Sequence, residues 1–196
     1  WIDRTQGIGV ITPEVAIQLG CSGPTLRGSG INWDIRKAMP YSGYEAYEFD
    51  VPTGEHGDVY DRFMCRLGEL RQSIRIIRQG ISRLPKGPFR SSNRKFVPPP
   101  RAEIGTSMEA LIHHFKLWTE GFSVPKGEVY ISVESPRGEL GCYLSSDGSN
   151  RPHRVHFRTP SFVHLGALSR MSEGAMIADL VAIIGSIDIV LGDCDR

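Results

Sequence analysis

The sequence predicts an α+β fold that is mainly helical and contains one small antiparallel sheet. Apolar residues recur every three or four positions over residues 58–82, which indicates a long amphipathic helix. Residues 128–134 alternate apolar and more polar side chains, and extended segments follow at 139–145 and 154–158. The turns expected between these strands are Pro136-Arg137-Gly138 and Asp147-Gly148-Ser149. No strand–helix–strand repetition is present, so the order of elements favours α+β over α/β.

Start and stop signals predict the remaining helices. Thr12 as N-cap, Pro13 in the first turn and Gly20 as a stop predict a short helix. Another helix should begin after Thr106 or Ser107 and stop at Gly121. Its buried side should consist of Met108, Leu111, Ile112, Phe115 and Trp118. A last, apolar helix is expected over residues 174–184.

Gly, Ser and Pro predict the irregular parts of the chain. Residues 20–44 should pack on the core with little regular structure, and residues 44–52 should hold a short extended stretch. A proline-rich loop is expected over residues 85–101, and a loop rich in Ser, Pro and His over residues 159–173.

Bulk properties exclude several classes of protein. With 196 residues and 40% hydrophobic composition, one domain is expected over residues 1–196. The net charge of +1 gives no reason to expect a nucleic-acid partner. No run of 18 apolar residues predicts a membrane span. Because the chain begins at Trp1 without Met, we interpret it as a fragment or as one product of a split or processed chain.

The candidate metal ligands have unfavourable spacing. Cys21, Cys65, Cys142 and Cys194 form no Cys-x-x-Cys motif, which argues against a zinc site or a cysteine-ligated cluster and favours reduced, structural thiols. His113 and His114 point about 100° apart on a helix and have only Glu109 nearby in the right register, so a structural or interface role is favoured. The other candidate ligands come from a strand and a loop: His153, His156 and His164. A regular strand would place His153 and His156 on opposite faces, so a shared metal site is disfavoured.

Other motifs have simple structural interpretations. Glu134 and Glu139 could form a glycosidase-like acid pair, but local ion pairing or hydrogen bonding around their shared hairpin is favoured. Gly28-Ser29-Gly30 lacks the third glycine of a dinucleotide fingerprint and is interpreted as a turn. The arginines of helix 58–82 are expected to form salt bridges and contacts with other chains rather than a nucleic-acid surface.

The C-terminal tail, residues 188–196, carries the strongest functional signal. Its sequence, Asp-Ile-Val-Leu-Gly-Asp-Cys-Asp-Arg, resembles the end of the large subunit of [NiFe]-hydrogenases, where two cysteines follow an aspartate and hold the metal. Aligned on Asp188, those cysteine positions fall on Val190 and Asp193, which cannot supply two thiolates. A hydrogenase scaffold without metal ligands is typical of the D subunit of respiratory NADH:quinone oxidoreductase, complex I.

The resemblance to the D subunit extends over the whole chain and corresponds to the C-terminal half of that subunit. The collinear blocks are Arg4–Thr12, Ser22–Gly30, Trp33–Lys37, Phe49–Pro52, Gly57–Arg62, Arg71–Ile77, Ser107–Lys116, Glu134–Glu139, Ser146–Ser149 and Asp188–Arg196. The resemblance implies a hydrogenase large-subunit-like helical core with a small antiparallel sheet. It also implies that the family's quinone-contacting His and Tyr lie in the N-terminal half, outside this chain.

The resemblance implies a subunit of proton-pumping NADH:quinone oxidoreductase that is inactive alone and forms part of the quinone-binding cavity. Val190, Leu191 and the terminal cluster Asp193–Arg196 would line or support the cavity. Val190 would offer apolar contact, and Asp195 and Arg196 would fix the terminus against neighbouring chains. No catalytic residue, metal ligand or bound cofactor is expected in this chain. Quinone would be the substrate, and the iron–sulfur cluster of a neighbouring subunit would supply the electrons.

The implied partners are the iron–sulfur B subunit, the C subunit, the membrane H subunit and the missing N-terminal half of the D subunit. The implied location is peripheral to the energy-converting membrane, on the cytoplasmic side in bacteria or the matrix side in mitochondria. We consider two alternatives. The tail decides against the large subunit of a membrane-bound hydrogenase or formate-hydrogenlyase, because Val190 and Asp193 are not thiols. A hydrogenase-derived structural scaffold without quinone contact stays open.

Overall fold

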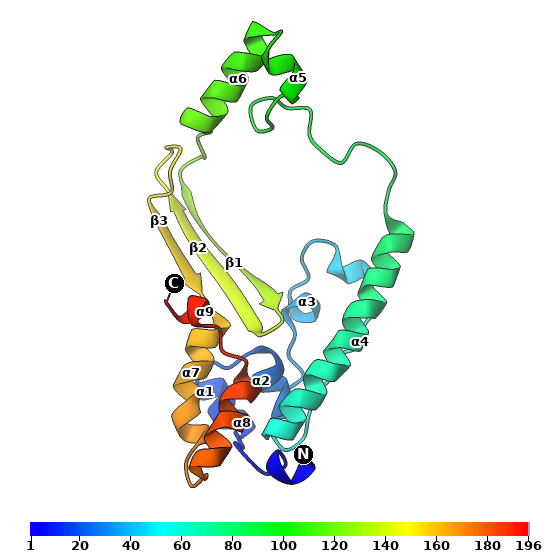
Figure 1. Cartoon of the computed structure of the whole chain (residues 1–196), viewed down its shortest axis with the longest axis vertical. Coiled ribbons are helices and arrows are strands. Elements are labelled where there is room, and N and C mark those ends of the chain that lie inside the picture. Colours follow the sequence, from blue (N-terminus) through cyan, green and yellow to red (C-terminus); the bar gives the residue numbers. More distant parts are fainter. Residues whose placement is uncertain (196) are drawn as a thin grey trace. The chain divides into compact units, whose positions relative to one another are not determined.

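The computed structural model describes residues 1–195, which separate into two compact units (Figure 1). The first unit comprises Trp1–Arg83, Ile131–Cys142 and Phe157–Arg196, and the second comprises Leu84–Tyr130 and Tyr143–His156. The expectation of one domain over residues 1–196 stays a prediction.

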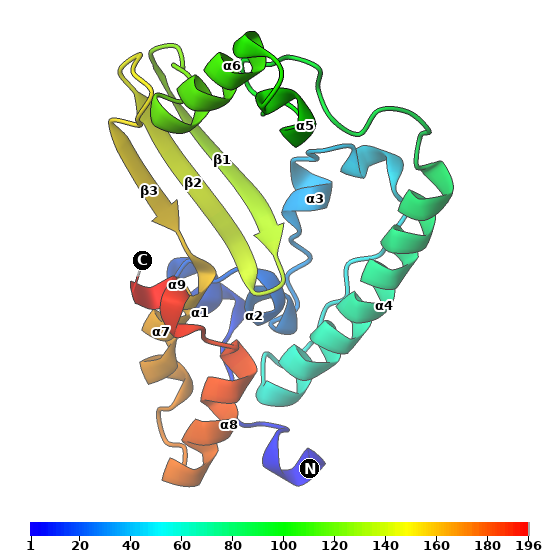
Figure 2. The same cartoon turned by 45° about the horizontal axis from the view of Figure 1, so that its top comes forward.

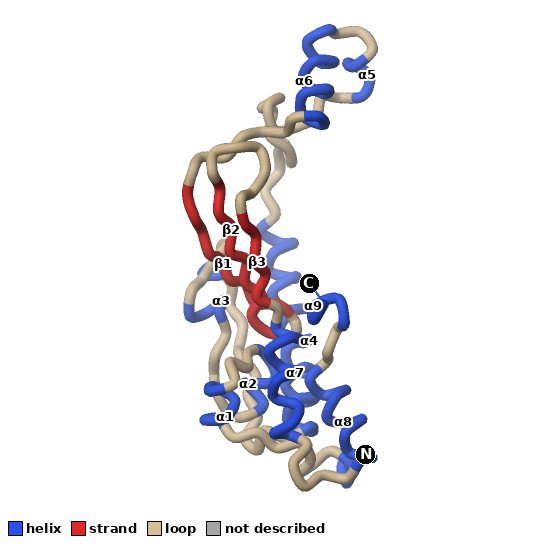
Figure 3. Tube along the Cα trace, turned by 90° about the vertical axis from the view of Figure 1, so that its left-hand side faces the viewer, coloured by secondary structure: helices blue, strands red, loops and turns tan. Residues whose placement is uncertain are grey.

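The first unit contains most of the helices. They are α1 (Pro13–Gln18), α2 (Gly23–Gly28), α3 (Ile35–Ala38), α4 (Val59–Arg83), α7 (Pro160–Met171), α8 (Ile177–Ile187) and α9 (Leu191–Asp195), with 3₁₀ turns η1 (Ile2–Arg4) and η2 (Tyr44–Ala46). Figure 3 shows α1, α2, α7 and α8 gathered together, and α4 packs against both α2 and α8. The second unit contains α5 (Arg101–Ile104) and α6 (Met108–Thr119).

One three-stranded antiparallel sheet completes the fold, as the sequence predicts. Its strands β1 (Gly127–Ser135), β2 (Gly138–Ser146) and β3 (Arg154–Arg158) lie in the order β1-β2-β3. The boundaries between the two units fall inside the strands. The α+β, mainly helical class is therefore confirmed, and all three strands lie where alternation and turn residues place them.

Helix starts are the most accurately predicted boundaries. Thr12 caps α1 by accepting a hydrogen bond from the Val15 amide, and Ser107 caps α6 by accepting one from the Ala110 amide. Gly121, with φ of +71°, follows the last turn of α6. The long helix predicted over residues 58–82 is α4.

Several predictions are wrong. Residues 20–44 contain the helices α2 and α3 instead of a mostly irregular segment. Within residues 44–52, η2 occupies the first three positions and Tyr47 after it is extended, so the short extended stretch expected there is not contradicted. The expected loop over 159–173 is mostly α7, because Pro160 starts a helix whose residues at four- and three-residue spacing are buried. The helix expected over residues 174–184 is α8, which begins at Ile177 and ends at Ile187, and the short helix α9 follows it. The side of α6 expected to be buried is exposed, with Trp118 71% accessible.

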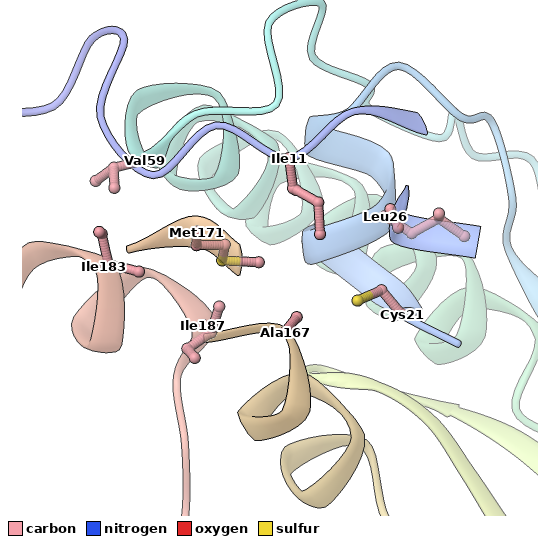
Figure 4. Packing of buried hydrophobic residues seen from close by; sticks show 9 residues of the cluster. Ile11, Cys21, Leu26, Val59, Ala167, Met171, Ile183 and Ile187 are labelled. Carbon is pink, nitrogen blue, oxygen red and sulfur yellow. The ribbon is translucent and has the colours of Figure 1, made fainter. Parts of the chain in front are cut away.

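The hydrophobic core of the first unit lies between α7, α8 and the chain before α2. Figure 4 shows Ile183 and Ile187 of α8 beside Met171 and Ala167 of α7. The other members of the cluster are Ile11, Ala16, Cys21, Leu26 and Val59. This core fixes α8 and thereby the point at which the C-terminal tail begins. Within residues 1–195, no helix has the length and apolar character needed to cross a bilayer.

Candidate site at the C-terminal tail

The tail begins with an abrupt change of direction at Asp188. The residue has φ of 52° and ψ of 54°, the left-handed conformation that ends helices and that Asp tolerates better than most residues. After this break Val190 is 37% exposed and Leu191 is 76% exposed. Two adjacent apolar side chains, the residues that the resemblance assigns to the quinone, are thus presented at the surface of this chain.

Two hydroxyl groups at the start of α7 hold the tail. Ser161 Oγ donates a hydrogen bond to Asp193 Oδ2 at 2.9 Å and accepts one from the Val190 amide at 3.4 Å. Thr159 Oγ1 donates to the Asp193 carbonyl oxygen at 2.6 Å. The short helix α9 therefore lies beside α7, as Figure 2 shows.

The β1–β2 hairpin contacts the tail from another direction. Arg137 Nε donates to the Asp188 carbonyl oxygen at 3.0 Å and lies 3.3 Å from Asp188 Oδ2. The hairpin turn itself is seated against α2: a Cβ on Gly23, whose φ is +60°, would come within 2.5 Å of the Gly138 Cα. Glycine at both positions allows this close approach of two backbones.

Ser22 and His164 join the same elements. Ser22 Oγ accepts a hydrogen bond from the Glu139 amide, and its own amide donates to His164 Nε2 at 3.2 Å. His164 is fully buried on α7 rather than in a loop, and burial, with Arg66 nearby, lowers its pKa from 6.5 to about 4. The imidazole is therefore neutral near pH 7, and no hydrogen bond to its buried Nδ1 is formed within the described residues.

A cavity of about 450 Å³ opens beside Asp188. The residues around it are mostly charged or polar and come from α2, α3, η2, α4, the hairpin and the start of the tail. The lining residues are Arg27, Arg36, Tyr44, Arg66, Glu69, Leu70, Ser73, Glu134, Ser135, Pro136 and Asp188. Val190 and Leu191 do not belong to this lining, so within the described residues the cavity and the apolar pair are neighbours along the tail rather than one pocket.

A buried ion cluster forms one wall of the cavity. Arg27, 1% exposed, lies 2.5 Å from Glu69 Oε1 and 2.8 Å from Glu134 Oε1, and Arg36 pairs with Asp34 at 2.6 Å. Burial raises the pKa of Glu134 even though Arg27 acts to lower it. Burial also acts to raise the pKa of Asp34, but the hydrogen bond and charge of Arg36 outweigh it, so this pKa is lowered.

The partners of Glu134 correct the prediction for the acid pair. The sequence suggested local ion pairing around the hairpin, yet Glu134 binds Arg27 and the Ile35 amide, 107 and 99 residues earlier in the chain. Glu139 lies 3.5 Å from Arg158 of β3, and the hairpin's own Arg137 binds Asp188. The ion pairs exist, but the fold rather than the hairpin creates those of Glu134 and Arg137.

The arginines at the start of α4 also depart from the prediction. Arg62 is fully buried and donates to three neutral oxygens: Ser186 Oγ, the Gly57 carbonyl and the Gly9 carbonyl. Because burial removes the guanidinium from water, and Arg66 repels it, the pKa of Arg62 falls to about 10. Further along the helix, Arg75 forms the expected surface ion pairs, with Glu48 and Asp50.

The structure brings some predicted site residues together and leaves others apart. Val190 and Leu191 are adjacent and exposed, and Asp195 is exposed at the end of α9. Arg196 lies outside the described residues. The sequence did not predict Thr159, Ser161 and Asp193 as a connected group, because the segment 159–173 was interpreted as a loop. The Thr159-Pro160 pair, a common helix start, was the signal that could have placed α7.

The side chains of the described residues form no candidate metal centre. Within residues 1–195, no group of three or more His, Cys, Asp or Glu side chains is close enough to share an ion. The four cysteines are free, with Cys21 and Cys65 buried. Burial raises the pKa of each of these two thiols to about 11, so both remain protonated near pH 7. Gly28-Ser29-Gly30 is the end of α2, in agreement with its interpretation as a turn.

Comparison with known proteins decides the family. The model of the family described as "Respiratory-chain NADH dehydrogenase, 49 Kd subunit" matches residues 1–196. The chain belongs to this family. Similar relatives include the NADH-quinone oxidoreductase D-2 subunit of Chloroflexus aurantiacus (57% identical) and the NADH-quinone oxidoreductase D subunit of Methylobacillus flagellatus (58% identical). The mitochondrial NADH-ubiquinone oxidoreductase 49 kDa subunit of Neurospora crassa is 53% identical.

These relatives are longer than the chain. In each comparison the match covers 100% of this chain, but only 48% of the two bacterial proteins and 41% of the Neurospora protein. The chain therefore spans about half the length of the curated relatives it matches.

Proposed function

We propose that this chain is the part of a proton-pumping NADH:quinone oxidoreductase subunit that supplies one wall of the quinone-binding cavity. Reduction of quinone to quinol takes up two electrons and two protons. The electrons would come from an iron–sulfur cluster held by the neighbouring B subunit, because the sequence of this chain offers no cluster ligands. The chain would have no activity alone.

The observation that carries this proposal is the exposed apolar pair Val190-Leu191, held in place on both sides. Asp188 is fixed by Arg137, and Asp193 is fixed by Thr159 and Ser161. A ligand pocket combines apolar walls with a few fixed polar groups. A rigid apolar edge next to a cavity lined by charged and polar residues supplies both kinds of surface, while Asp195 and Arg196 would contact neighbouring chains.

The remaining surfaces fit a subunit that works within a larger assembly. From its middle to its end, α4 exposes apolar side chains that are between 51% and 72% accessible: Leu70, Ile74, Ile77 and Ile81. Contiguous apolar surface of this kind marks a contact face. The other half of the full-length subunit would cover this face, and the B, C and H subunits would adjoin it. Within this assembly the chain would be peripheral to the energy-converting membrane, on the cytoplasmic side in bacteria or the matrix side in mitochondria.

Val190→Met in the assembled complex tests the proposal. Methionine adds bulk to a packed apolar wall, which typically costs about 1–3 kcal/mol and should weaken the affinity of a ligand that fills the space by roughly tenfold or more. The variant should change the concentration of a quinone-site inhibitor that halves quinone reductase activity. Reduction of the clusters by NADH should stay unchanged. Identical inhibition curves in a fully assembled variant would favour the alternative, a structural scaffold without quinone contact.

A further inference from the structure

Ser161 occupies an unusual position between the core and the tail. It is the second residue of α7, and its side chain is completely buried. The one hydroxyl group contacts two tail residues, as acceptor for the Val190 amide and as donor to the Asp193 carboxylate. These contacts lie on either side of Leu191, so a single side chain restrains both ends of the exposed apolar pair.

Thr159 contributes a second contact at the expense of its usual role. It stands at the N-cap of α7, where a threonine side chain normally accepts a hydrogen bond from an amide of the first turn. Among the described residues its hydroxyl forms no such cap and instead donates to the Asp193 carbonyl oxygen. The hydroxyl groups of Thr159 and Ser161, both at the start of α7, therefore donate to Asp193.

The charge of Asp193 suits this location. Its carboxylate lies at the N-terminal turn of α7, a helix of 12 residues, where the helix dipole favours an anion. At the other end of the tail, Arg137 holds Asp188. The segment between Asp188 and Asp193 is thus fixed at two points, and Val190 and Leu191 have little freedom to turn.

We propose that Ser161 is a positioning residue for the quinone cavity: it sets the direction in which Val190 and Leu191 face. This role rests on the proposed function. Ser161 lies outside the tail, yet it would control the affinity of the site for quinone. Ser161 would not touch the quinone itself and would act only through Val190 and Asp193.

The test compares Ser161→Ala, Asp193→Ala and the double variant in the assembled complex. Two quantities are measured for each: hydrogen exchange of the peptide that covers residues 188–196, and the inhibitor concentration that halves quinone reductase activity. Ser161→Ala removes both hydrogen bonds of this hydroxyl to the tail and should accelerate exchange of the tail amides. It should also raise the half-inhibitory concentration and the KM for quinone by about threefold to tenfold, because the quinone feels this loss only through the changed position of Val190 and Leu191. The kcat at saturating quinone should change little.

Two further variants separate positioning from general stability. Ser172→Ala removes a hydroxyl from the far end of the same helix, where Ser172 Oγ donates to the Leu168 carbonyl, and should leave tail exchange and inhibition unchanged. Asp193→Asn keeps an oxygen that can accept from Ser161 and should retain most of the tail protection. Because Ser161 and Asp193 act as a pair, the double variant should resemble the single ones rather than show added effects.

The outcomes are distinguishable. Additive effects of Ser161→Ala and Asp193→Ala, or unchanged tail exchange in Ser161→Ala, would overturn the inference. A loosened tail with unchanged inhibition would also overturn it. In that case Val190→Met decides whether the proposed function holds. If Val190→Met shifts the inhibition curve, the proposed function stands without a role for Ser161. If neither variant shifts the curve, both the proposed function and the positioning role are wrong.

Discussion

The two ends of α4 reverse the usual relation between hydrophobicity and burial. In its first two turns Arg62 is fully buried and Asp61 nearly so, while in its last turns Ile77 is 58% exposed and Ile81 is 72% exposed. The buried end packs against α2 and α8, and its polar groups bind the segments around it. The beginning of α4 is therefore completed by contacts within this chain, whereas its end leaves apolar side chains exposed, as is typical of a contact face.

Hydrogen bonds explain the buried end. Asp58 accepts bonds from the Asp61 and Gly7 amides, and Arg62 joins the loop before α1, the loop before α4 and helix α8. A buried cation without a carboxylate partner is costly unless its donors are satisfied. Arg62 meets this condition with neutral oxygens, which makes it a connector of three segments rather than half of an ion pair.

Arg62→Met should have the largest effect on this region. The variant leaves the Gly9 and Gly57 carbonyl groups and Ser186 Oγ without their donor, and it should lower the free energy of opening of α4 and α8 by about 4 kcal/mol. Native-state hydrogen exchange in the assembled complex measures this quantity. Arg71→Met, at an exposed position of the same helix, is the matched control and should change it by less than about 0.5 kcal/mol. Equal effects of the two variants would contradict the connector role.

Acidification should weaken the buried region through His164. Its pKa is about 4 in the folded chain against 6.5 as the ordinary value, so the unfolded state binds a proton more readily. This group therefore does not change the free energy of opening above about pH 6.5. As the pH falls towards 4, its protonation should lower that free energy by about 3 kcal/mol in total. Native-state hydrogen exchange from about pH 7 to 4 measures the free energy of opening of this buried region. The decrease should be smaller in His164→Gln than in the unmodified protein. The same decrease in both proteins would mean that other groups cause it.

Ile77→Ser should have the smallest effect on this chain and a larger one on assembly. The side chain already faces the surface of the chain, so its loss should change the free energy of opening of α4 by less than about 0.5 kcal/mol. Burial against the rest of the full-length subunit would make the same change reduce the yield of assembled complex. A yield equal to that of the unmodified protein would show that the exposed end of α4 remains uncovered in the assembly.

Sequence patterns predicted local structure better than the site. Patterns among sequence neighbours correctly predicted the N-caps Thr12 and Ser107 and the positions of α4 and β1. The alternation expected along β1 does not appear in its burial, because the first five residues of the strand are all exposed. The contacts of Glu134 with Arg27 and of Ser161 with Asp193 join residues 107 and 32 positions apart. No local period encodes such contacts. The predicted burial of α6 was wrong because an apolar stripe shows that a helix has a contact face but does not show whether this chain covers it.

Family resemblance selected a segment for the site but not its geometry. Val190 and Leu191 lie together at the surface, in a place that suits an apolar wall. The groups that hold them, Thr159 and Ser161, come from a segment interpreted as a loop. Their role became visible only when α7 placed two hydroxyl groups against Asp193.

The central claim, that the tail forms a wall of the quinone cavity, is tested most directly by photolabelling. A photoreactive quinone analogue is activated in the assembled complex, and the labelled peptides are identified by mass spectrometry with and without a competing quinone-site inhibitor. We predict inhibitor-sensitive label within residues 189–196 and loss of part of it in Ser161→Ala. Inhibitor-sensitive label on neighbouring chains with none on this peptide would contradict the claim.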